Sequence, residues 1–260
     1  VVVLAPVGHL GFPEQRSGVP IDRDDVSVIG SGPTAPDPTT YRDAIRCLRR
    51  HGLWSMIPQS VRTHLTRGVE GRLADTPKPG TRRVRRVQHE IIGNNTMALK
   101  ALTATARSAG WRTLVLPPYT TQAREAGAQM GALARSIVLC RRPLTRPCCV
   151  IAGGETIVTV TGNGTGGRAQ EFAVAAAKAV AGLPRVYVAA IATDGTDGPT
   201  DAAGALVSGA TWKRAERMGM DLDKALTRND TYRVLKRLNG HIMTGPTGTN
   251  VNDLYLLFVF

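Results

Sequence analysis

The run VYVAAIATDGTDGPTD, residues 186–201, decides the fold class of this chain. Its first seven residues are apolar without a break, which is typical of a strand buried on both faces of a sheet. From Thr193 the composition changes to glycine, proline and aspartate, which favour a turn. Open α/β sheets bind their ligands at the carboxyl ends of buried strands. The run therefore predicts an α/β fold and the edge at which a site would lie.

Strands and helices alternate along the rest of the chain. Short apolar or β-branched runs predict further strands over residues 1–7, 87–92, 114–116, 148–152, 156–160 and 254–260. Apolar residues at helical spacing predict helices over residues 41–51, 96–109, 121–135 and 168–181, a short helix after Pro58, and helical stretches within 217–238. This alternation favours a doubly wound α/β domain with a parallel sheet.

Residues 141–147, RRPLTRP, predict a linker, because two prolines and three arginines separate two apolar segments. We therefore expect two domains. Residues 1–140 would form a partial, doubly wound, Rossmann-like domain, and residues 148–260 a second α/β domain. The chain opens on VVVL without a methionine, in an apolar run typical of a buried strand, so we expect it to begin inside a longer fold.

Composition excludes several classes of protein. Because 42% of the residues are hydrophobic, the chain can bury a core and is not wholly disordered. Its four cysteines show no C-x-x-C spacing, so they suggest neither a zinc site nor a disulfide scaffold. No apolar stretch reaches the roughly 18 to 20 residues that a membrane span requires. We expect a cytoplasmic protein with no membrane partner.

Charge is strongly positive, with 33 Lys and Arg against 20 Asp and Glu, a net charge of +13. Basic runs such as RCLRR at 46–50 and RRVRR at 82–86 lack the interleaved aromatic residues of a nucleic-acid platform. We therefore interpret them as solvated faces and do not expect nucleic acid as a partner. Non-catalytic binding of a polyanion stays open as an alternative.

Three polar clusters could carry chemistry. In GNGTGGRAQE, residues 162–171, glycines precede a helix start, where free backbone N–H groups, the helix dipole and Arg168 favour an anion. These glycines also match the dinucleotide-binding pattern G-x-G-x-x-G formally. The alternative interpretation of the segment is a plain turn that binds no ligand. In ATDGTDGPTD, residues 192–201, the carboxylates of Asp194, Asp197 and Asp201 could hold Mg²⁺ or act as a general base, or the Asp-Gly pairs could only stabilise turns. TGPTGTNVND, residues 244–253, suits close approach of backbone to a ligand, or a surface turn.

Five segments, in this order, closely resemble the C-terminal MOFRL domain of the bacterial-type glycerate 2-kinases. They are GGETIVTV at 153–160, GGRAQE at 166–171, ATDGTDGPTDAA at 192–203, Asn229-Asp230 followed by Tyr232, and TGPTGTNVND at 244–253. Two upstream segments, DDVSVIGSGPTAPDPT at 24–39 and IIGNN at 91–95, are similar to the second half of the family's N-terminal domain. The resemblance covers nearly the whole chain from Asp24 onward.

The resemblance implies ATP-dependent transfer of a phosphoryl group to a hydroxyl of D-glycerate, with Mg²⁺, in a cleft between two α/β domains. Arg168 would then hold the glycerate carboxylate or the transferring phosphate, and Asp194 and Asp197 would orient the metal or the hydroxyl. The implied substrate- and nucleotide-binding residues are Ser31, Gly32, Asn94, Glu155, Gly166, Gly167, Gly245, Thr247, Gly248, Asn250 and Asn252.

The sequence departs from the family's pattern in three places. Family members carry an additional N-terminal segment, with a glycine-rich loop and a lysine that help to form the site, and this chain begins after it. The family's Ser-Asp-Val strand end is Ala5-Pro6-Val7 here, and Ala169 stands where the family has asparagine. We therefore expect a truncated member with impaired activity. Reduction of hydroxypyruvate is a second enzymatic alternative, and a homodimer stays open.

Overall fold

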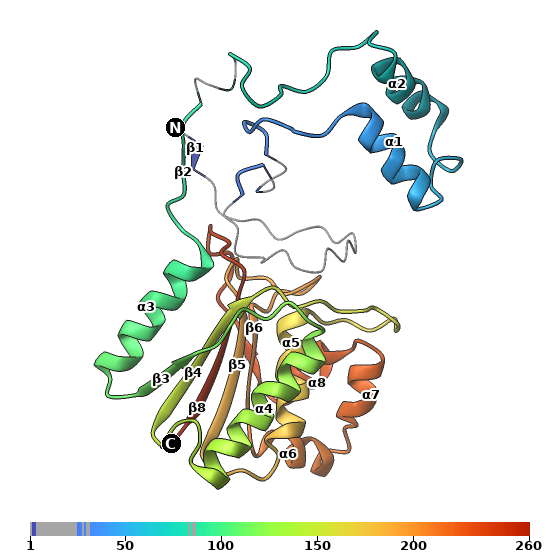
Figure 1. The fold of residues 1–260 in the computed structure, drawn as a ribbon. Helices are drawn as coiled ribbons and strands as arrows, with labels where there is room; N and C mark the ends of the chain where they lie inside the picture. The colour runs from blue at the N-terminus through green and yellow to red at the C-terminus, as the bar shows by residue number, and fades with distance from the viewer. Residues whose placement is uncertain (1, 4–24, 28, 30–31, 83, 85–86) are drawn as a thin grey trace. The chain divides into compact units, whose positions relative to one another are not determined.

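Contacts within the chain divide it into two units. The computed structural model describes residues 2–3, 25–27, 29, 32–82, 84 and 87–260. Contacts assign the described residues up to Ile92 to the first unit, and Gly93–Phe260 to the second. Figure 1 labels most of the elements of both units.

The described residues of the first unit form two helices and a short pair of strands. Helix α1, Tyr41–Arg50, begins at Thr40, whose side chain and that of Asp43 form a capping box, and α2 spans Gln59–Val69. A Cβ on Gly68 would lie 2.3 Å from the ring of Tyr41, so glycine allows the two helices to meet. Strands β1, Val2–Val3, and β2, His89–Glu90, pair in parallel. The helices predicted over 41–51 and after Pro58 are confirmed.

The second unit is built on a six-stranded mixed sheet. The strands are β3 (Arg112–Val115), β4 (Cys148–Gly154), β5 (Val186–Ala192), β6 (Gly204–Ser208), β7 (His241–Ile242) and β8 (Asp253–Val259). Their order in the sheet is β3-β4-β8-β5-β6-β7, and β8 runs antiparallel to both β4 and β5. Asp253, the first residue of β8, therefore pairs with Gly154 and Ala192, where β4 and β5 end. This register brings together, at one end of the strands, the loop after β4, the loop after β5 and the loop before β8.

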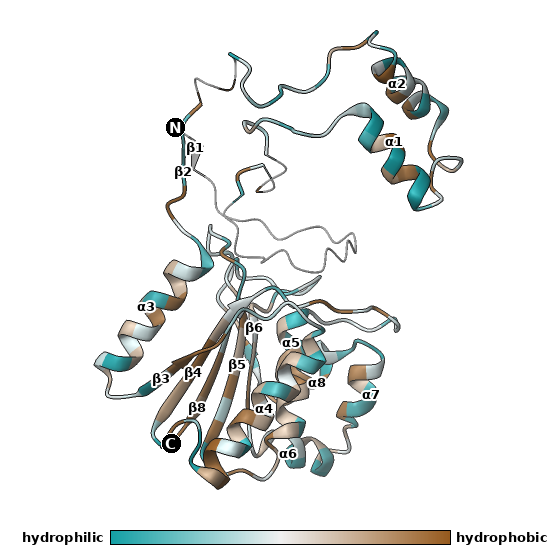
Figure 2. Cartoon of the chain, in the orientation of Figure 1, coloured by the Kyte–Doolittle hydropathy of each residue, from teal (hydrophilic) through white to brown (hydrophobic). Residues whose placement is uncertain are grey.

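Helices cover both faces of this sheet. Helix α3, Asn95–Ser108, lies on β3 and β4, and α4, Ala123–Cys140, packs with α5, Arg168–Ala179, on the other face (Figure 1). Three short helices follow: α6, Thr211–Arg217, α7, Leu222–Thr227, and α8, Thr231–Arg237. Most of the length of the central strands is hydrophobic (Figure 2). The core between this sheet and α5 includes Phe172, Tyr255 and Met130, which are fully buried.

Glycine and alanine bring α4 and α5 into close contact. A Cβ on Gly127 would lie 2.2 Å from the carbonyl oxygen of Phe172, and a Cβ on Gly131 would lie 2.3 Å from the Cβ of Ala179. Both distances are far below van der Waals contact, so any side chain at either position would force the helices apart.

We expect Gly127→Ala to lower the free energy of unfolding by about 2 to 3 kcal/mol, although alanine favours a helix by about 1 kcal/mol over glycine. Urea denaturation would measure the change. The matched control is Ala128→Gly, at an exposed position of the same helix. It should lower the free energy of unfolding by only about 1 kcal/mol. A neutral or stabilising Gly127→Ala would contradict this packing.

The α/β class is confirmed, but the arrangement of strands differs from the prediction in several details. Residues 156–160 form no strand, and Ile157 makes only an isolated bridge to Gln122. The sequence does not predict strand β6, and the sheet is mixed because β8 runs antiparallel to β4 and β5, and β6 runs antiparallel to β5 and β7. Residues 141–147 join α4 to β4 within the second unit. Strand β3, which precedes them in the chain, pairs with β4, which follows them. The domain boundary at 141–147 stays a prediction. Most of the strand predicted over 1–7 lies outside the described residues.

Candidate active site

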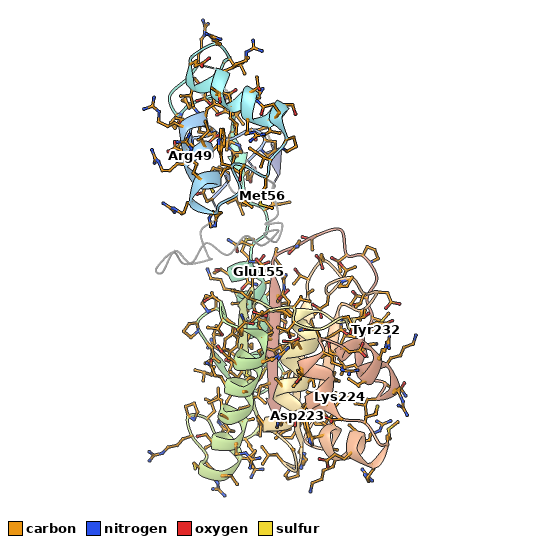
Figure 3. The ribbon with its side chains drawn as sticks, turned by 90° about the vertical axis from the view of Figure 1, so that its right-hand side faces the viewer. Arg49, Met56, Glu155, Asp223, Lys224 and Tyr232 are labelled. Carbon is orange, nitrogen blue, oxygen red and sulfur yellow. The ribbon has the colours of Figure 1, made fainter. Side chains whose placement is uncertain are left out.

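Arg168 is the first residue of α5 and lies at the edge of the sheet where β4 and β5 end. Its Nε and Nη2 atoms donate hydrogen bonds to the two carboxylate oxygens of Asp253, at 2.7 and 3.2 Å. Its Nη1 atom donates to Glu155, which follows β4, at 2.6 Å. Glu155 is labelled at this end of the unit in Figure 3. Burial opposes the charge of Arg168, but both carboxylates offset it, and the pKa of the guanidinium is raised.

Asp253 is fully buried, and it accepts a hydrogen bond from the hydroxyl of Tyr255, which is itself hydrogen-bonded to Thr156. The hydroxyl of Tyr255 donates to Asp253 Oδ2 at 3.0 Å, and Thr156 Oγ1 lies 2.9 Å from that hydroxyl. Burial raises the pKa of Asp253 to about 6, although Arg168 acts in the opposite direction. Burial also raises the pKa of Tyr255, which therefore stays a hydroxyl donor.

Asp197 occupies the N-terminus of α5. Its two carboxylate oxygens accept hydrogen bonds from the backbone N–H groups of Ala169 and Gln170, at 3.1 and 2.8 Å. Only 1% of the residue is exposed, and burial raises its pKa. These contacts support the role of a helix cap instead of the predicted role of a metal ligand or base. The anion predicted at this helix N-terminus is the protein's own carboxylate.

The glycine-rich turn before α5 packs against the turn between α7 and α8. The backbone N–H groups of Thr161 and Gly162 donate to the side chain of Asn229, and that of Gly164 donates to the carbonyl of Arg228. A Cβ on Gly162, Gly164 or Gly166 would lie 2.2 to 2.4 Å from atoms of residues 228–231. The glycines thus permit close contact between two turns. The free N–H groups predicted here are engaged at these positions, so the plain-turn alternative is the one that the geometry supports.

The loops after β5 and before β8 are joined by hydrogen bonds. Asn250 Nδ2 donates to Asp194 Oδ2 at 3.2 Å, and the hydroxyl of Thr247 donates to the carbonyl of Thr193. Thr193 Oγ1 in turn donates to the carbonyl of Asn252 at 2.7 Å. Asp194 is partly exposed, unlike Asp197. Asp194 is therefore an accessible carboxylate at the same edge as Arg168.

The other predicted site residues are dispersed. Gly245 and Gly248 lie in the exposed loop before β8, while Gly166 and Gly167 lie in the turn before α5. Asn94 accepts a hydrogen bond from the N–H of Met97 and caps α3. Gly32 lies in the first unit with φ of 56°, which suits glycine. Ser31 lies outside the described residues.

Sequence reasoning did not select several residues that organise the site. Asp253 binds Arg168, Tyr255 donates to Asp253, and Asn95 Nδ2 donates to the carbonyls of Val251 and Asp253, fixing the start of β8. The available signal was an aspartate at 253 directly before an apolar run, a position where a charge is costly unless it is paired. Glu171 is also buried, and it accepts from Arg124 and Asn229.

No group of three His, Cys, Asp or Glu side chains is arranged to hold a metal ion in the described part of the chain. The oxygens of Asp197 are buried and cap α5, whereas the carboxylate of Asp194, which accepts hydrogen bonds from Thr196 and Asn250, is partly exposed. A single carboxylate suits Mg²⁺ that is held mainly by the phosphates of a nucleotide. Among the described helices, none is both long and apolar enough to cross a bilayer.

Two family models match this chain. The MOFRL family matches residues 148–253, beginning directly after the predicted linker, and a domain of unknown function (DUF4147) matches residues 18–66. In solved structures, the chain is similar to the glycerate kinase of Thermotoga maritima, with a TM-score of 0.77 and 38% identity over 91% of this chain and 54% of that one. The fold and these matches define an α/β protein with a MOFRL-type domain.

Curated relatives narrow this class to a family. The chain is 38% identical to a glycerate 2-kinase of Pyrococcus horikoshii, over 91% of this chain and 53% of that protein. It is 33% identical to a glycerate kinase of Macaca fascicularis, over 91% of this chain and 69% of that protein. The chain belongs to the glycerate kinase family. It spans about half the length of several curated relatives that it matches, including those of P. horikoshii and T. maritima.

Proposed function

We propose that this chain transfers a phosphoryl group from ATP to a hydroxyl of D-glycerate. In this reaction the hydroxyl oxygen forms a bond to the γ-phosphorus and releases its proton to solvent, the bond from that phosphorus to the bridging oxygen breaks, and ADP leaves. The observation that carries the proposal is the pair of ion pairs that fix Arg168 to Asp253 and Glu155. Arg168 lies beside the loop of Asp194, and the chain belongs to the glycerate kinase family.

The chemistry of Arg168 fits an anionic substrate. A guanidinium has five N–H groups, and the contacts with Asp253 and Glu155 use three of them. One N–H remains on each of Nη1 and Nη2, and these can bind the glycerate carboxylate or the transferring phosphate. Phosphoryl transfer depends mainly on positioning and on neutralising charge, which such a fixed cation provides.

Asp194 is the residue that we assign to the metal and to the acceptor hydroxyl. It is accessible, and Asn250 orients its carboxylate. Bound Mg²⁺ would neutralise charge on the phosphates of ATP. The exposed loop over residues 244–250 provides small hydrogen-bonding residues beside this carboxylate, which suits contact with a nucleotide.

The geometry does not favour the oxidoreductase alternative. A dinucleotide fingerprint requires open glycine N–H groups that lead into a helix N-terminus. Here residues 161–165 bond to the turn at 228–230, and Asp197 fills the helix N-terminus. A pyrophosphate at that position would meet a buried carboxylate.

A coupled assay of ADP release tests the proposed function. With Mg²⁺ and ATP, we expect ADP to form only when D-glycerate is present, and ³¹P NMR should detect a phosphoglycerate. Reactions without glycerate control for ATP hydrolysis. Oxidation of NADH or NADPH by hydroxypyruvate without ATP would support the oxidoreductase instead. Binding of RNA that weakens steeply with salt, without turnover, would support the polyanion alternative.

A further inference from the structure

The two acidic partners of Arg168 differ in their attachment to the protein. The Asp253 side chain is 1% exposed and binds the guanidinium through both oxygens, whereas the Glu155 side chain is 16% exposed and binds through one. Asp253 begins the central strand β8, which is paired on both sides. Glu155 lies in the loop after β4. The position of the guanidinium plane is thus set by Asp253.

A chain of hydroxyl groups fixes Asp253 in turn. Tyr255 lies two residues along β8, on the same face of the sheet, and donates to Asp253 Oδ2. The N–H and the hydroxyl of Thr156 both lie within hydrogen-bonding distance of the Tyr255 oxygen. Because that tyrosine proton is directed to Asp253, the Thr156 hydroxyl donates to tyrosine. The ring of Tyr255 packs against Phe172 and Tyr119, with centroids 4.3 and 5.6 Å apart.

This arrangement leaves a defined part of Arg168 for a ligand. Asp253 covers the edge formed by Nε and Nη2, and Glu155 contacts Nη1. One N–H group remains on each of the two terminal nitrogens, where it can donate to an oxyanion. A rotation of the guanidinium would move these donors away from the ligand, and a displacement of about 1 Å is enough to slow a reaction about 100-fold.

We propose that Asp253 is a positioning residue for Arg168, and that Tyr255 and Thr156 hold Asp253 in the orientation that aims the free N–H groups at the substrate oxyanion. This inference rests on the proposed function for its kinetic consequences. Its structural part, the fixed orientation of Arg168, has an independent readout.

The kinetic test compares Asp253→Asn and Tyr255→Phe with a matched control, Tyr187→Phe, at an exposed tyrosine of β5. We expect Asp253→Asn to lower kcat/KM for D-glycerate about 100-fold, and Tyr255→Phe, which keeps the ring, about tenfold. The KM for ATP should change by less than about twofold in each. In an Arg168→Ala background, Asp253→Asn should have almost no further effect on turnover, because a positioning residue acts only through its partner. Additive losses would overturn the proposal.

NMR of the arginine Nε–H groups gives a readout that needs no turnover. The Arg168 signal, assigned by its loss in Arg168→Lys, should be protected from solvent exchange and should lose that protection in Asp253→Asn and Tyr255→Phe. An inactive wild-type chain with this pattern would refute the proposed function and keep the positioning role. Unchanged protection of Arg168 in Asp253→Asn would refute the positioning role, whatever the activity.

Discussion

Arg168→Ala should lower kcat/KM for glycerate phosphorylation by about 1,000-fold, because it removes the fixed cation that binds an oxyanion in the transition state. The ADP-release assay measures this loss. The fold should persist, since Asp253 already has a pKa of about 6 beside Arg168 and can take up a proton when the guanidinium is gone. Thermal unfolding of the variant would show that the chain remains folded at the assay temperature.

Arg237→Ala is the matched control for this prediction. Arg237 is exposed in the last turn of α8 and belongs to the same strongly basic chain. If general positive charge attracted ATP, both variants would lose activity to a similar extent. Turnover that survives Arg168→Ala would remove this residue from the site.

Asp197→Ala should lower the free energy of unfolding by about 2 to 4 kcal/mol, because it removes both acceptors from the buried N-terminus of α5. Asp194→Ala should lower the free energy of unfolding by less than about 1 kcal/mol, because Asp194 is accessible and its main contacts lie within two loops. It should instead abolish turnover. Urea denaturation and the ADP-release assay separate the two effects.

This pair of variants distinguishes two roles for neighbouring aspartates. Two ligands of one metal would both lose activity and would both show a weaker dependence on Mg²⁺ concentration. A loss of Mg²⁺ dependence in Asp197→Ala, with unchanged stability, would restore the role that the sequence predicts for Asp197.

Local elements of the fold were predictable because their signals are local. Thr40 with Asp43 marks the start of α1, Asn94 caps α3, and the unbroken apolar run at 186–192 gives the bounds of β5. The order of strands was not predictable in this way. Strand β8 lies between β4 and β5 because of packing between residues about 100 positions apart. No short turn connects β8 to β4 or to β5, so no local sequence signal predicts this pairing.

The candidate site shows the same division. Arg168 and Glu155 were selected from their sequence context, and the structure brings them together at 2.6 Å. The partner of Arg168 that is buried most deeply, Asp253, is 85 residues away in the chain. Glycines and aspartates near a helix start are compatible with binding a phosphate or a second turn. Only the positions of Asn229 and Asp197 decide between these interpretations.

The central place of β8 has a consequence for synthesis on the ribosome. Strands β4 and β5 are made first, and each presents an open edge until residues 253–259 emerge from the exit tunnel. Until then the β3-β4 part and the β5-β6 part of the sheet are not joined to each other. Because β8 also carries Asp253, the pairing of β8 with β4 and β5 joins the sheet and anchors Arg168 in the same step.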